Sequence, residues 1–417
     1  MHILFLSDNF PPEVNAPASR TFEHCREWVK AGHEVTVITC FPNFPQGKLY
    51  EGYRNALRQV EITEGIRVVR VWSYITANKG FLKRILDYAS FMASAVATSL
   101  FVKKPHVVVG TSPQFFTACA AYMVSRIKHA PFIFELRDIW PESIKAVGAM
   151  NDSLVIRLLE RLEMFLYHNA ARIVSVTESF KKVLVERGVE AGKIDVVTNG
   201  VDISCFRPRP KDPELVARYD LEGKFTAGYV GTHGMAHALE TVLDAAHMLR
   251  GNGHKDDFHF ILLGNGARKQ DLVERAATMG LENVTFINSV PKDQVTRYWS
   301  LLDASIIHLK KTPLFSSVIP SKLFECMGMG IPVLHGVVGE SGDIVTQEQV
   351  GLTFEPENAA ELCEKLVQLK EDQALCNRLK DRCMPAARHY DRTELACRML
   401  GILEKTARES HDRRRLA

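Results

Sequence analysis

The residues best suited to bind an anion lie in the stretch 320–333, which reads Pro-Ser-Lys-Leu-Phe-Glu-Cys-Met-Gly-Met-Gly-Ile-Pro-Val. Pro320 and Ser321 are typical of a helix start, which places Lys322 in the first turn. A lysine there can reach an anion, and the helix dipole adds to the attraction. Glu325 follows on the same face, where its carboxylate could bind a diol. A surface Lys–Glu pair is the alternative interpretation.

Two glycine turns follow expected strands in the second half of the chain. Gly231 opens the turn 231–237, Gly-Thr-His-Gly-Met-Ala-His, and Gly264-Asn265-Gly266 comes after the next strand. Glycine lets a backbone approach a phosphate closely. Neither turn has the pattern G-x-G-x-x-G with a downstream acid, so a dinucleotide oxidoreductase is not indicated.

The first half contains two polar loops that could also bind a ligand. The loop 8–17 is long for a strand-to-helix connection, and it contains Glu13, Asn15 and three prolines. Long loops at the carboxyl end of a sheet are often binding loops. A surface loop of unusual shape would have the same sequence pattern and is the alternative interpretation.

The second polar loop, 135–142, reads Glu-Leu-Arg-Asp-Ile-Trp-Pro-Glu and follows a buried type of strand. Charges in such a place must be paired or hydrated. Arg137 could pair internally with Asp138 or Glu142. We favour a role for Asp138 in contacting a ligand.

These candidates are spaced along an alternation of apolar strands and amphipathic helices, which is typical of parallel sheets covered on both faces. In the first half we expect strands at 2–7, 34–39, 66–72, 106–110, 132–135, 172–176 and 194–198, and helices at 18–31, 114–129 and 154–169. In the second half we expect strands at 225–230, 258–263, 284–287, 304–308, 332–335 and 351–354, and helices at 236–250, 268–279, 292–301, 321–327 and 359–369.

The alternation stops in a turn-rich stretch at 199–213, which we interpret as a linker. The sequence therefore predicts two doubly wound, Rossmann-like α/β domains, 1–205 and 206–389, with a cleft between them. A final helix, 390–410, is expected to pack back on the first domain. Ligands of such sheets bind beyond the carboxyl ends of the strands.

Bulk composition excludes several classes of protein. A chain of 417 residues with a net charge of +3 gives no reason to expect a nucleic acid partner. Nine cysteines without a Cys-x-x-Cys pair fit a reducing compartment and no structural zinc. The apolar start reads as a first strand rather than a signal peptide. The most apolar window, 85–102, contains an aspartate and several hydroxyl residues, so we expect no membrane span.

Taken together, these motifs resemble the family 4 retaining glycosyltransferases of the GT-B fold. The resemblance is carried by Pro11-Pro12-Glu13, by 32–39 (Gly-His-Glu-Val-Thr-Val-Ile-Thr), by 199–202 (Asn-Gly-Val-Asp), by the turn at Gly231 and by 320–333. The stretch 137–143, Arg-Asp-Ile-Trp-Pro-Glu-Ser, looks like a bacterial O-antigen and capsule subgroup that transfers N-acetylfucosamine-type or related amino sugars.

The resemblance implies a transferase that uses a UDP-sugar, retains the anomeric configuration and needs no metal or other cofactor. The absence of Asp-x-Asp agrees with this. The acceptor would be a polyprenyl-diphosphate-linked saccharide. Lys322 matches the phosphate-contacting lysine of the family, and Glu325 matches its ribose-binding glutamate. The implied donor site is Gly231, Thr232, His233, Gly264, Arg268, Val290, Ser321, Lys322, Leu323 and Glu325; the implied acceptor site is Glu13, Asn15, Trp140 and Glu142, with Arg137 and Asp138 joining Lys322 in catalysis.

Three departures from the family pattern bear on this assignment. Ser317 stands where the first glutamate of the Glu-x7-Glu pair is usual. Thr232 and His237 replace an Arg and Lys pair, which leaves Lys322, with His233 or Arg268 as helpers, to counter the diphosphate. No histidine occupies the place of Arg137 and Asp138, where many relatives carry one.

The segment 79–104 combines basic residues with bulky apolar ones, including Phe81 and Phe91. It could rest on an anionic membrane surface where a lipid-linked acceptor waits, which predicts a cytoplasmic protein bound to the inner face of the membrane. The alternative is a core helix with basic ends.

Three other functions stay open at this point. Twin Rossmann-like domains also occur in nucleotide-sugar 2-epimerases and in sugar phosphorylases, which form product without an acceptor or need free phosphate. A non-catalytic subunit that binds a sugar nucleotide is the third possibility, and Ser317 is its main support.

Overall fold

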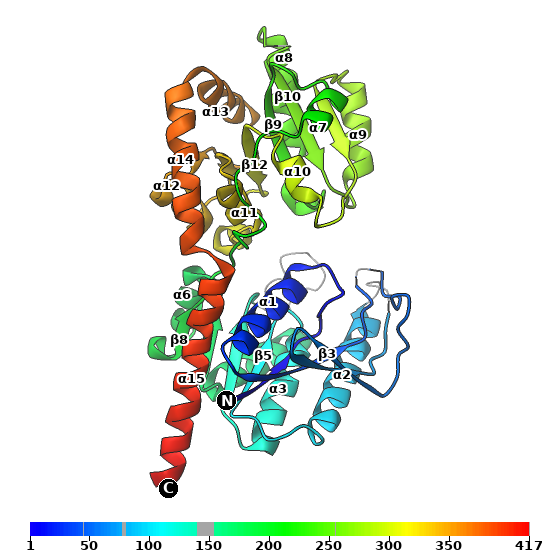
Figure 1. Cartoon of the computed structure of the whole chain (residues 1–417), viewed down its shortest axis with the longest axis vertical. Helices are drawn as coiled ribbons and strands as arrows, with labels where there is room; N and C mark the ends of the chain where they lie inside the picture. Colours follow the sequence, from blue (N-terminus) through cyan, green and yellow to red (C-terminus); the bar gives the residue numbers. More distant parts are fainter. Residues whose placement is uncertain (45, 77–80, 140–153, 255, 417) are drawn as a thin grey trace. The chain divides into compact units, whose positions relative to one another are not determined.

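The computed structural model (Figure 1) describes residues 1–44, 46–76, 81–139, 154–254 and 256–416. They form two compact units, the first comprising Met1–Thr198 and Arg392–Ala417 and the second Asn199–Asp391. Each unit is a doubly wound α/β domain, so the predicted fold class is confirmed. The unit boundaries lie at 198/199 and 391/392, where the sequence predicts 205/206 and 389/390.

The first unit is built on an eight-stranded sheet in the order β3-β4-β2-β1-β5-β6-β7-β8. Its strands are β1 (His2–Leu6), β2 (Glu34–Cys40), β3 (Arg58–Thr63), β4 (Ile66–Val71), β5 (Val107–Thr111), β6 (Phe132–Leu136), β7 (Arg172–Ser175) and β8 (Ile194–Val196). All pairs are parallel except β3 with β4. The strand order reverses between β1 and β5, and ligands bind at such a switch point.

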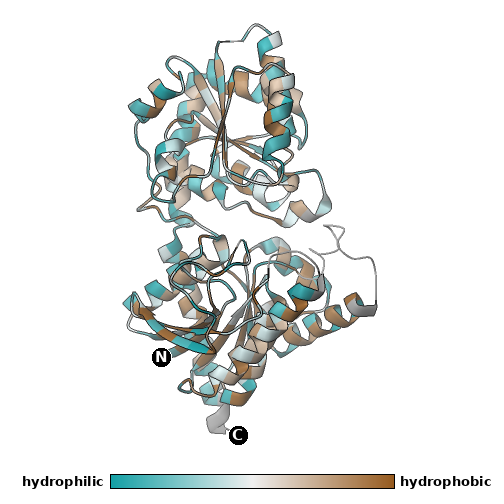
Figure 2. Ribbon diagram, turned by 90° about the vertical axis from the view of Figure 1, so that its right-hand side faces the viewer, coloured by the Kyte–Doolittle hydropathy of each residue, from teal (hydrophilic) through white to brown (hydrophobic). Residues whose placement is uncertain are grey.

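Helices cover both faces of this sheet, because strands such as β1 and β5 are apolar and buried on both sides. One face is covered by α1 (Ala16–Lys30) and α15 (Arg392–Leu416), the other by α2 (Phe81–Ser99), α3 (Phe115–Lys128), α5 (Leu154–Asn169) and α6 (Glu178–Glu186). A short 3-10 helix, η1 (Ala191–Lys193), precedes β8. Figure 2 shows apolar strands in the interior and polar residues on the outer sides of the helices.

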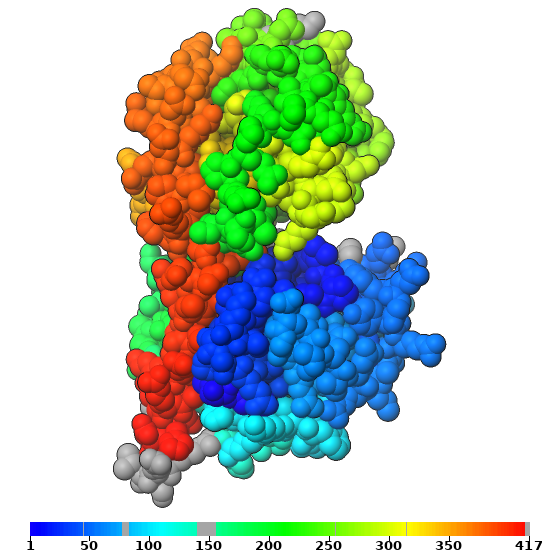
Figure 3. Space-filling view, in the orientation of Figure 1, coloured from blue at the N-terminus to red at the C-terminus, as the bar shows by residue number. Residues whose placement is uncertain are grey.

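Helix α15 completes the first unit although it follows the second unit in the chain. Leu395, Met399 and Leu403, four residues apart, point into the core beside Trp28 of α1. The Trp28 indole N–H donates to the Ala396 carbonyl at 2.9 Å. The atoms of α15 lie directly against those of α1 in the space-filling view (Figure 3). The last helix is therefore an integral layer of the first unit.

The second unit contains a six-stranded parallel sheet in the order β11-β10-β9-β12-β13-β14. Its strands are β9 (Phe225–Val230), β10 (Phe258–Leu263), β11 (Val284–Ile287), β12 (Ala304–His308), β13 (Val333–Gly336) and β14 (Gly351–Thr353). Its helices are α7 (Pro213–Arg218), η2 (Met235–His237), α8 (Glu240–Gly251), α9 (Lys269–Thr278), α10 (Val295–Trp299), η3 (Pro313–Ser317), α11 (Lys322–Met329), α12 (Glu340–Glu348), α13 (Ala359–Glu371) and α14 (Gln373–His389). The switch point lies between β9 and β12, next to the turn at Gly231.

The stretch 199–213 is not the free linker that the sequence predicts. Val201 pairs with Asp391 in an isolated bridge, and its N–H donates to the Tyr390 carbonyl at 3.0 Å. Phe206 is buried and lies against Gly328 of α11. Turn-forming residues mark an irregular backbone, but these apolar side chains are buried in the second unit.

Candidate active site

Helix α11 begins at Lys322, one residue after the predicted start at Ser321, and Ser321 does not cap it with its side chain. The Ser321 backbone is already helical (φ −57°, ψ −27°), whereas a capping residue usually has an extended backbone. The Leu323 N–H donates to the Pro320 carbonyl and the Phe324 N–H to the Ser321 carbonyl. The first N–H groups, of Ser321 and Lys322, therefore remain available to a ligand at the start of the helix.

The Lys322 ammonium is held at the switch point of the second unit. Its Nζ lies 3.8 Å from the centre of the ring of Tyr229, the penultimate residue of β9. Among the described residues, it makes no hydrogen bond or ion pair. Burial lowers the pKa of Lys322 to about 8, while the nearby charge of Glu325, one turn later on α11, acts in the opposite direction. A partly buried cation without a paired carboxylate is suited to bind an anionic group.

The glycine turns after β9 and β10 interlock. Gly231 and Gly264 have φ angles of +146° and +148°, which only glycine adopts readily. A Cβ on Gly264 would lie 1.8 Å from the Gly231 carbonyl oxygen. The His233 N–H donates to the Asn265 carbonyl at 2.9 Å, and the Arg268 N–H donates to the His233 carbonyl at 3.0 Å. The two turns form one rigid floor beside Lys322.

Two expected helpers of Lys322 are not free cations. Burial lowers the pKa of His233 to about 4, so its ring is neutral near pH 7. The Arg268 guanidinium lies 2.6 Å from a Glu240 oxygen and 3.2 Å from an Asp271 oxygen. That these two side chains and the exposed Thr232 contact the sugar-nucleotide donor stays a prediction.

The remaining predicted donor residues, Leu323 and Val290, belong to the second unit, as does Ser317, which replaces the usual glutamate. Leu323 is fully buried, so a ligand could contact only its backbone. Val290 is half-buried and packs against the core of the second unit. Ser317, at the end of η3, is half-buried.

Three residues at this site escaped sequence reasoning. The Tyr229 hydroxyl donates to the Thr232 carbonyl at 2.8 Å and so fixes the turn. The Lys269 ammonium donates to the Gly264 and Ile287 carbonyls, at 2.7 and 2.9 Å, and holds the ends of β10 and β11 together. Lys310 follows β12 with an exposed side chain, while its N–H donates to the Ala236 carbonyl. These roles depend on tertiary contacts that no local motif signals.

In the first unit, Glu13 is an internal brace of the first loop. Its Oε1 accepts hydrogen bonds from the Asn43 and Phe44 N–H groups, both at 2.8 Å, and its Oε2 accepts one from the Phe10 N–H at 3.3 Å. Asn15 caps α1 by accepting a hydrogen bond from the Ala18 N–H at 2.8 Å. Both residues shape the loop at the carboxyl end of β1, and their contact with an acceptor stays a prediction.

Asp8, in the same loop, is a further candidate that the sequence did not single out. Burial, together with smaller contributions from the carboxylates of Asp87 and Glu13, raises the pKa of Asp8 to about 8. A carboxyl group at the switch point that exchanges its proton near neutral pH is suited to bind hydroxyl groups.

The loop after β6 places Arg137 and Asp138 at the same edge of the sheet. Their N–H groups donate to the Ser112 hydroxyl at 2.8 and 3.2 Å, which fixes the backbone of the loop. The predicted acceptor residues Trp140 and Glu142 lie outside the described residues.

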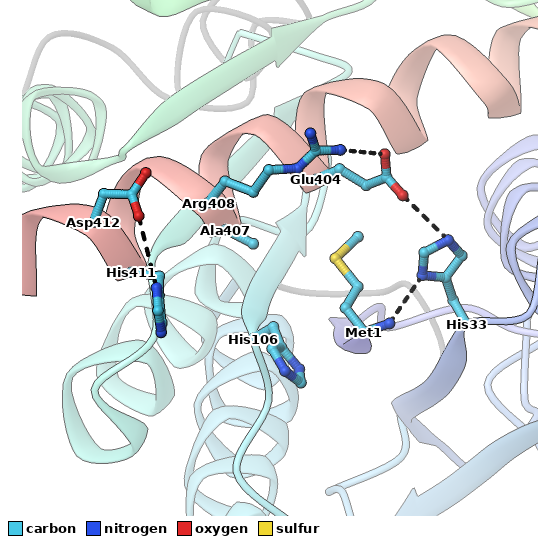
Figure 4. A pocket seen from close by; sticks show the side chains of 8 residues that line it. All are labelled: Met1, His33, His106, Glu404, Ala407, Arg408, His411 and Asp412. Carbon is cyan, nitrogen blue, oxygen red and sulfur yellow. Dashed lines mark hydrogen bonds and ion pairs between the residues drawn. The ribbon is translucent and has the colours of Figure 1, made fainter. Parts of the chain in front are cut away.

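A pocket of about 410 Å3 in the first unit is unrelated to these loops (Figure 4). It is lined by Met1, His33, His106, Glu404, Ala407, Arg408, His411 and Asp412. Its polar groups contact one another: His33 lies 3.4 Å from Glu404, which also contacts Arg408 at 3.1 Å. These contacts tie the outer half of α15 to the start of β1 and β2.

Residues 81–104 of the predicted membrane segment 79–104 form α2 and the turn that follows it, while residues 79 and 80 and the side chain of Phe81 lie outside the described part of the chain. Phe91 is fully buried and packs in the core of the first unit, which agrees with the alternative interpretation of a core helix for this part of α2; membrane contact by the segment stays a prediction. Leu86, Leu100 and Phe101 are exposed. None of the described helices is long and apolar enough to cross a membrane. In the described part of the chain, no three His, Cys, Asp or Glu side chains are grouped in a way that could hold a metal ion.

Comparison with known proteins identifies the class. Residues 15–200 match the glycosyl transferase 4-like domain, and residues 213–383 match the glycosyl transferases of group 1. With two doubly wound sheets and these two domains, the chain is a glycosyltransferase of the GT-B fold.

Individual relatives agree with this class. WcaI of Escherichia coli strain K12, whose name assigns it provisionally to colanic acid biosynthesis, is 27% identical over 340 residues, covering 79% of this chain and 82% of WcaI. WbjE of Pseudomonas aeruginosa, named provisionally as a glycosyltransferase, is 22% identical over 68% of this chain and 70% of its own. The structure of Anabaena HepE with UDP and glucose superposes with a TM-score of 0.70 at 17% identity, covering 96% of this chain and 99% of HepE.

Proposed function

We propose that this glycosyltransferase moves a sugar from a UDP-sugar to a polyprenyl-diphosphate-linked saccharide in the synthesis of a bacterial surface polysaccharide. The transferred sugar would be an N-acetylated amino or deoxy sugar, transferred with retention and without a metal. Two comparisons support parts of this proposal: WcaI is named for a polysaccharide, and HepE has been solved with UDP.

The observation that carries the proposal is the unpaired ammonium of Lys322 at the start of α11. A departing diphosphate gains negative charge in the transition state. A fixed cation at that position stabilises the transition state more than the ground state, and this difference accelerates transfer. The free N–H groups of Ser321 and Lys322 and the positive end of α11 act in the same direction.

The other donor contacts follow from the geometry and the family resemblance. Gly231 would lie under the diphosphate, because it leaves its backbone open next to Lys322 Nζ. Glu325 would bind the ribose, and Val290 would lie near the base. Lys310 offers a second cation at the end of β12. Asp138 and Arg137 would act from the acceptor side.

The experiment compares Lys322→Ala with wild type for UDP affinity and for sugar transfer to a polyprenyl-diphosphate-linked saccharide. We expect weaker UDP binding and turnover lowered by about 10²-fold or more. Lys311→Ala is the matched control, since Lys311 is exposed and pairs with Glu355. A Lys322→Ala enzyme at wild-type rate would contradict the proposal.

The same assay separates the rival functions. UDP binding without transfer to any polyprenyl acceptor would indicate a non-catalytic subunit, and product without acceptor would indicate an epimerase. We expect transfer to persist in the presence of EDTA. We also expect NMR of the product to show the same anomeric configuration as in the donor.

A further inference from the structure

A cluster of arginines and glutamates lies where β6 ends in the first unit. The Arg20 Nε donates to Glu135 Oε1 at 2.9 Å, and its Nη2 donates to the Val197 carbonyl at 2.9 Å. The Arg392 Nη1 contacts both carboxylate oxygens of Glu23, at 2.8 and 2.7 Å. Each of these two arginines is thus matched by a glutamate.

Arg137 is the third arginine, and its charge is not matched in this way. Its Nε and Nη1 atoms are buried and have no hydrogen-bond partner among the residues that the structure describes. Burial and the positive charges of Arg20 and Arg392 lower the pKa of Arg137 to about 10, against the opposing charge of Glu135. Glu135 already pairs with Arg20, so the described residues of this cluster include three arginines and two glutamates, one more cation than carboxylates.

Other polar atoms nearby are also unsatisfied. Within the described ranges, neither the Glu135 Oε2 nor the hydroxyl of Thr21, which follows Arg20 on α1, has a hydrogen-bond partner, and both atoms are buried. Burial and the three arginines lower the pKa of His24, so this neighbour is neutral and does not supply a balancing charge. A buried cation with idle donors is costly unless an anion or ordered water satisfies it.

We propose that Arg137 binds an oxyanion of the acceptor substrate, a phosphate or a carboxylate group. The assignment rests on the proposed function for the identity of the acceptor. A guanidinium presents donors in a planar fork that matches both oxyanions. The Ser112 hydroxyl holds the Arg137 backbone at the carboxyl edge of the sheet, where ligands of such sheets bind. Arg137 would therefore position the acceptor for attack on the donor sugar.

The test measures anion binding to the full chain in phosphate-free buffer with saturating UDP, so that the donor site is filled. Methyl phosphate and glucuronate serve as the two probes, and the one that binds identifies the source of the oxyanion. We expect wild type to bind one of them and Arg137→Gln to bind it at least tenfold more weakly. Arg137→Lys should be intermediate, because it keeps the charge and loses the fork. Arg126→Gln, on the exposed surface of α3, is the matched control and should bind like wild type.

A stability measurement distinguishes this role from a purely structural one. Without anions, Arg137→Met should melt at or above the wild-type temperature, because the substitution removes an unmatched buried charge. Addition of the probe should raise the melting temperature of wild type but not that of Arg137→Met. Failure of wild type to bind either probe, or equal affinity in Arg137→Gln, overturns the inference. The titration is repeated without UDP in Lys322→Ala, whose proposed donor site is impaired. We expect this variant to bind the probe like wild type, because Arg137 lies in the other unit. A failure of UDP binding therefore counts against the proposed function and not against the role of Arg137.

Discussion

The ammonium of Lys322 occupies the space that a side chain on Gly231 would need. A Cβ on Gly231 would lie 2.7 Å from Lys322 Nζ, and the residue has a φ of +146°. Gly231→Ala should therefore strain the turn, at a cost of about 1–3 kcal/mol, and displace the ammonium. We expect a lower melting temperature and at least tenfold weaker UDP binding by calorimetry.

Gly234→Ala is the control for this substitution. Gly234 lies three residues later with a φ of −104°, and the nearest side-chain atom to an added Cβ is 3.5 Å away, an ordinary contact. Equal UDP affinities in wild type and Gly231→Ala would show that the turn and Lys322 do not act together.

UDP binding should weaken at alkaline pH because of Lys322. The pKa of its ammonium is about 8 in the free protein, and the charged form binds the diphosphate. Above pH 8 a proton must be taken up on binding, so the affinity should fall by up to about tenfold per pH unit. Calorimetry from pH 7 to 9.5 measures this slope. Lys322→Ala should show a flatter profile, and the idea is wrong if the two slopes agree.

The second unit should lose stability in acid because of its buried histidines. Burial lowers the pKa of His335 to about 3, and its Nε2 lies 2.8 Å from the Ser341 hydroxyl. A pKa depressed in the folded state means that the unfolded chain takes up the proton first as pH falls below about 6.5. By pH 5 this costs about 2 kcal/mol for His335.

Denaturant titrations at pH 7 and pH 5 can measure that loss. His335→Gln keeps a hydrogen-bonding group but cannot be protonated, so its loss of unfolding free energy should be smaller than that of wild type. His247→Gln, on the exposed side of α8, is the control. If His335→Gln lost as much unfolding free energy between pH 7 and pH 5 as wild type does, the assignment to His335 would be wrong.

We expect membrane binding by the segment 79–104 to depend on the turn after α2. Leu100 and Phe101 are 59% and 71% exposed and precede Lys103 and Lys104. Apolar side chains next to cations suit an anionic lipid surface. The double substitution Leu100→Ser and Phe101→Ser should reduce co-sedimentation with phosphatidylglycerol vesicles several-fold. Val185→Ser, an exposed apolar residue of α6, should not change it.

The sequence predicts much of the second unit because its central strands are short apolar runs. The strands β9 and β10 have the predicted bounds to the residue. It misses β3, whose sequence Arg-Gln-Val-Glu-Ile-Thr is largely exposed at the sheet edge and pairs antiparallel. It also misses α14, since Pro385 within that helix reads as a helix breaker.

The candidate site shows the same division between local and tertiary information. The helix start at Lys322 follows from a local pattern and lies one residue from the predicted start at Ser321. The contact of Lys322 with Tyr229 joins α11 to β9, more than ninety residues earlier, and no local pattern encodes it. The pairing of Arg268 with Glu240 likewise depends on how α8 and α9 pack.

The placement of α15 has a consequence for biosynthesis. The chain leaves the first unit after Thr198 and returns at Arg392, so the Trp28 indole meets its carbonyl partner only after the whole of the second unit has been translated. At about 5–20 residues per second, the intervening stretch delays that contact by about 10–40 s. During this interval the nascent first unit exposes an apolar strip, which makes it a candidate client for ribosome-associated chaperones.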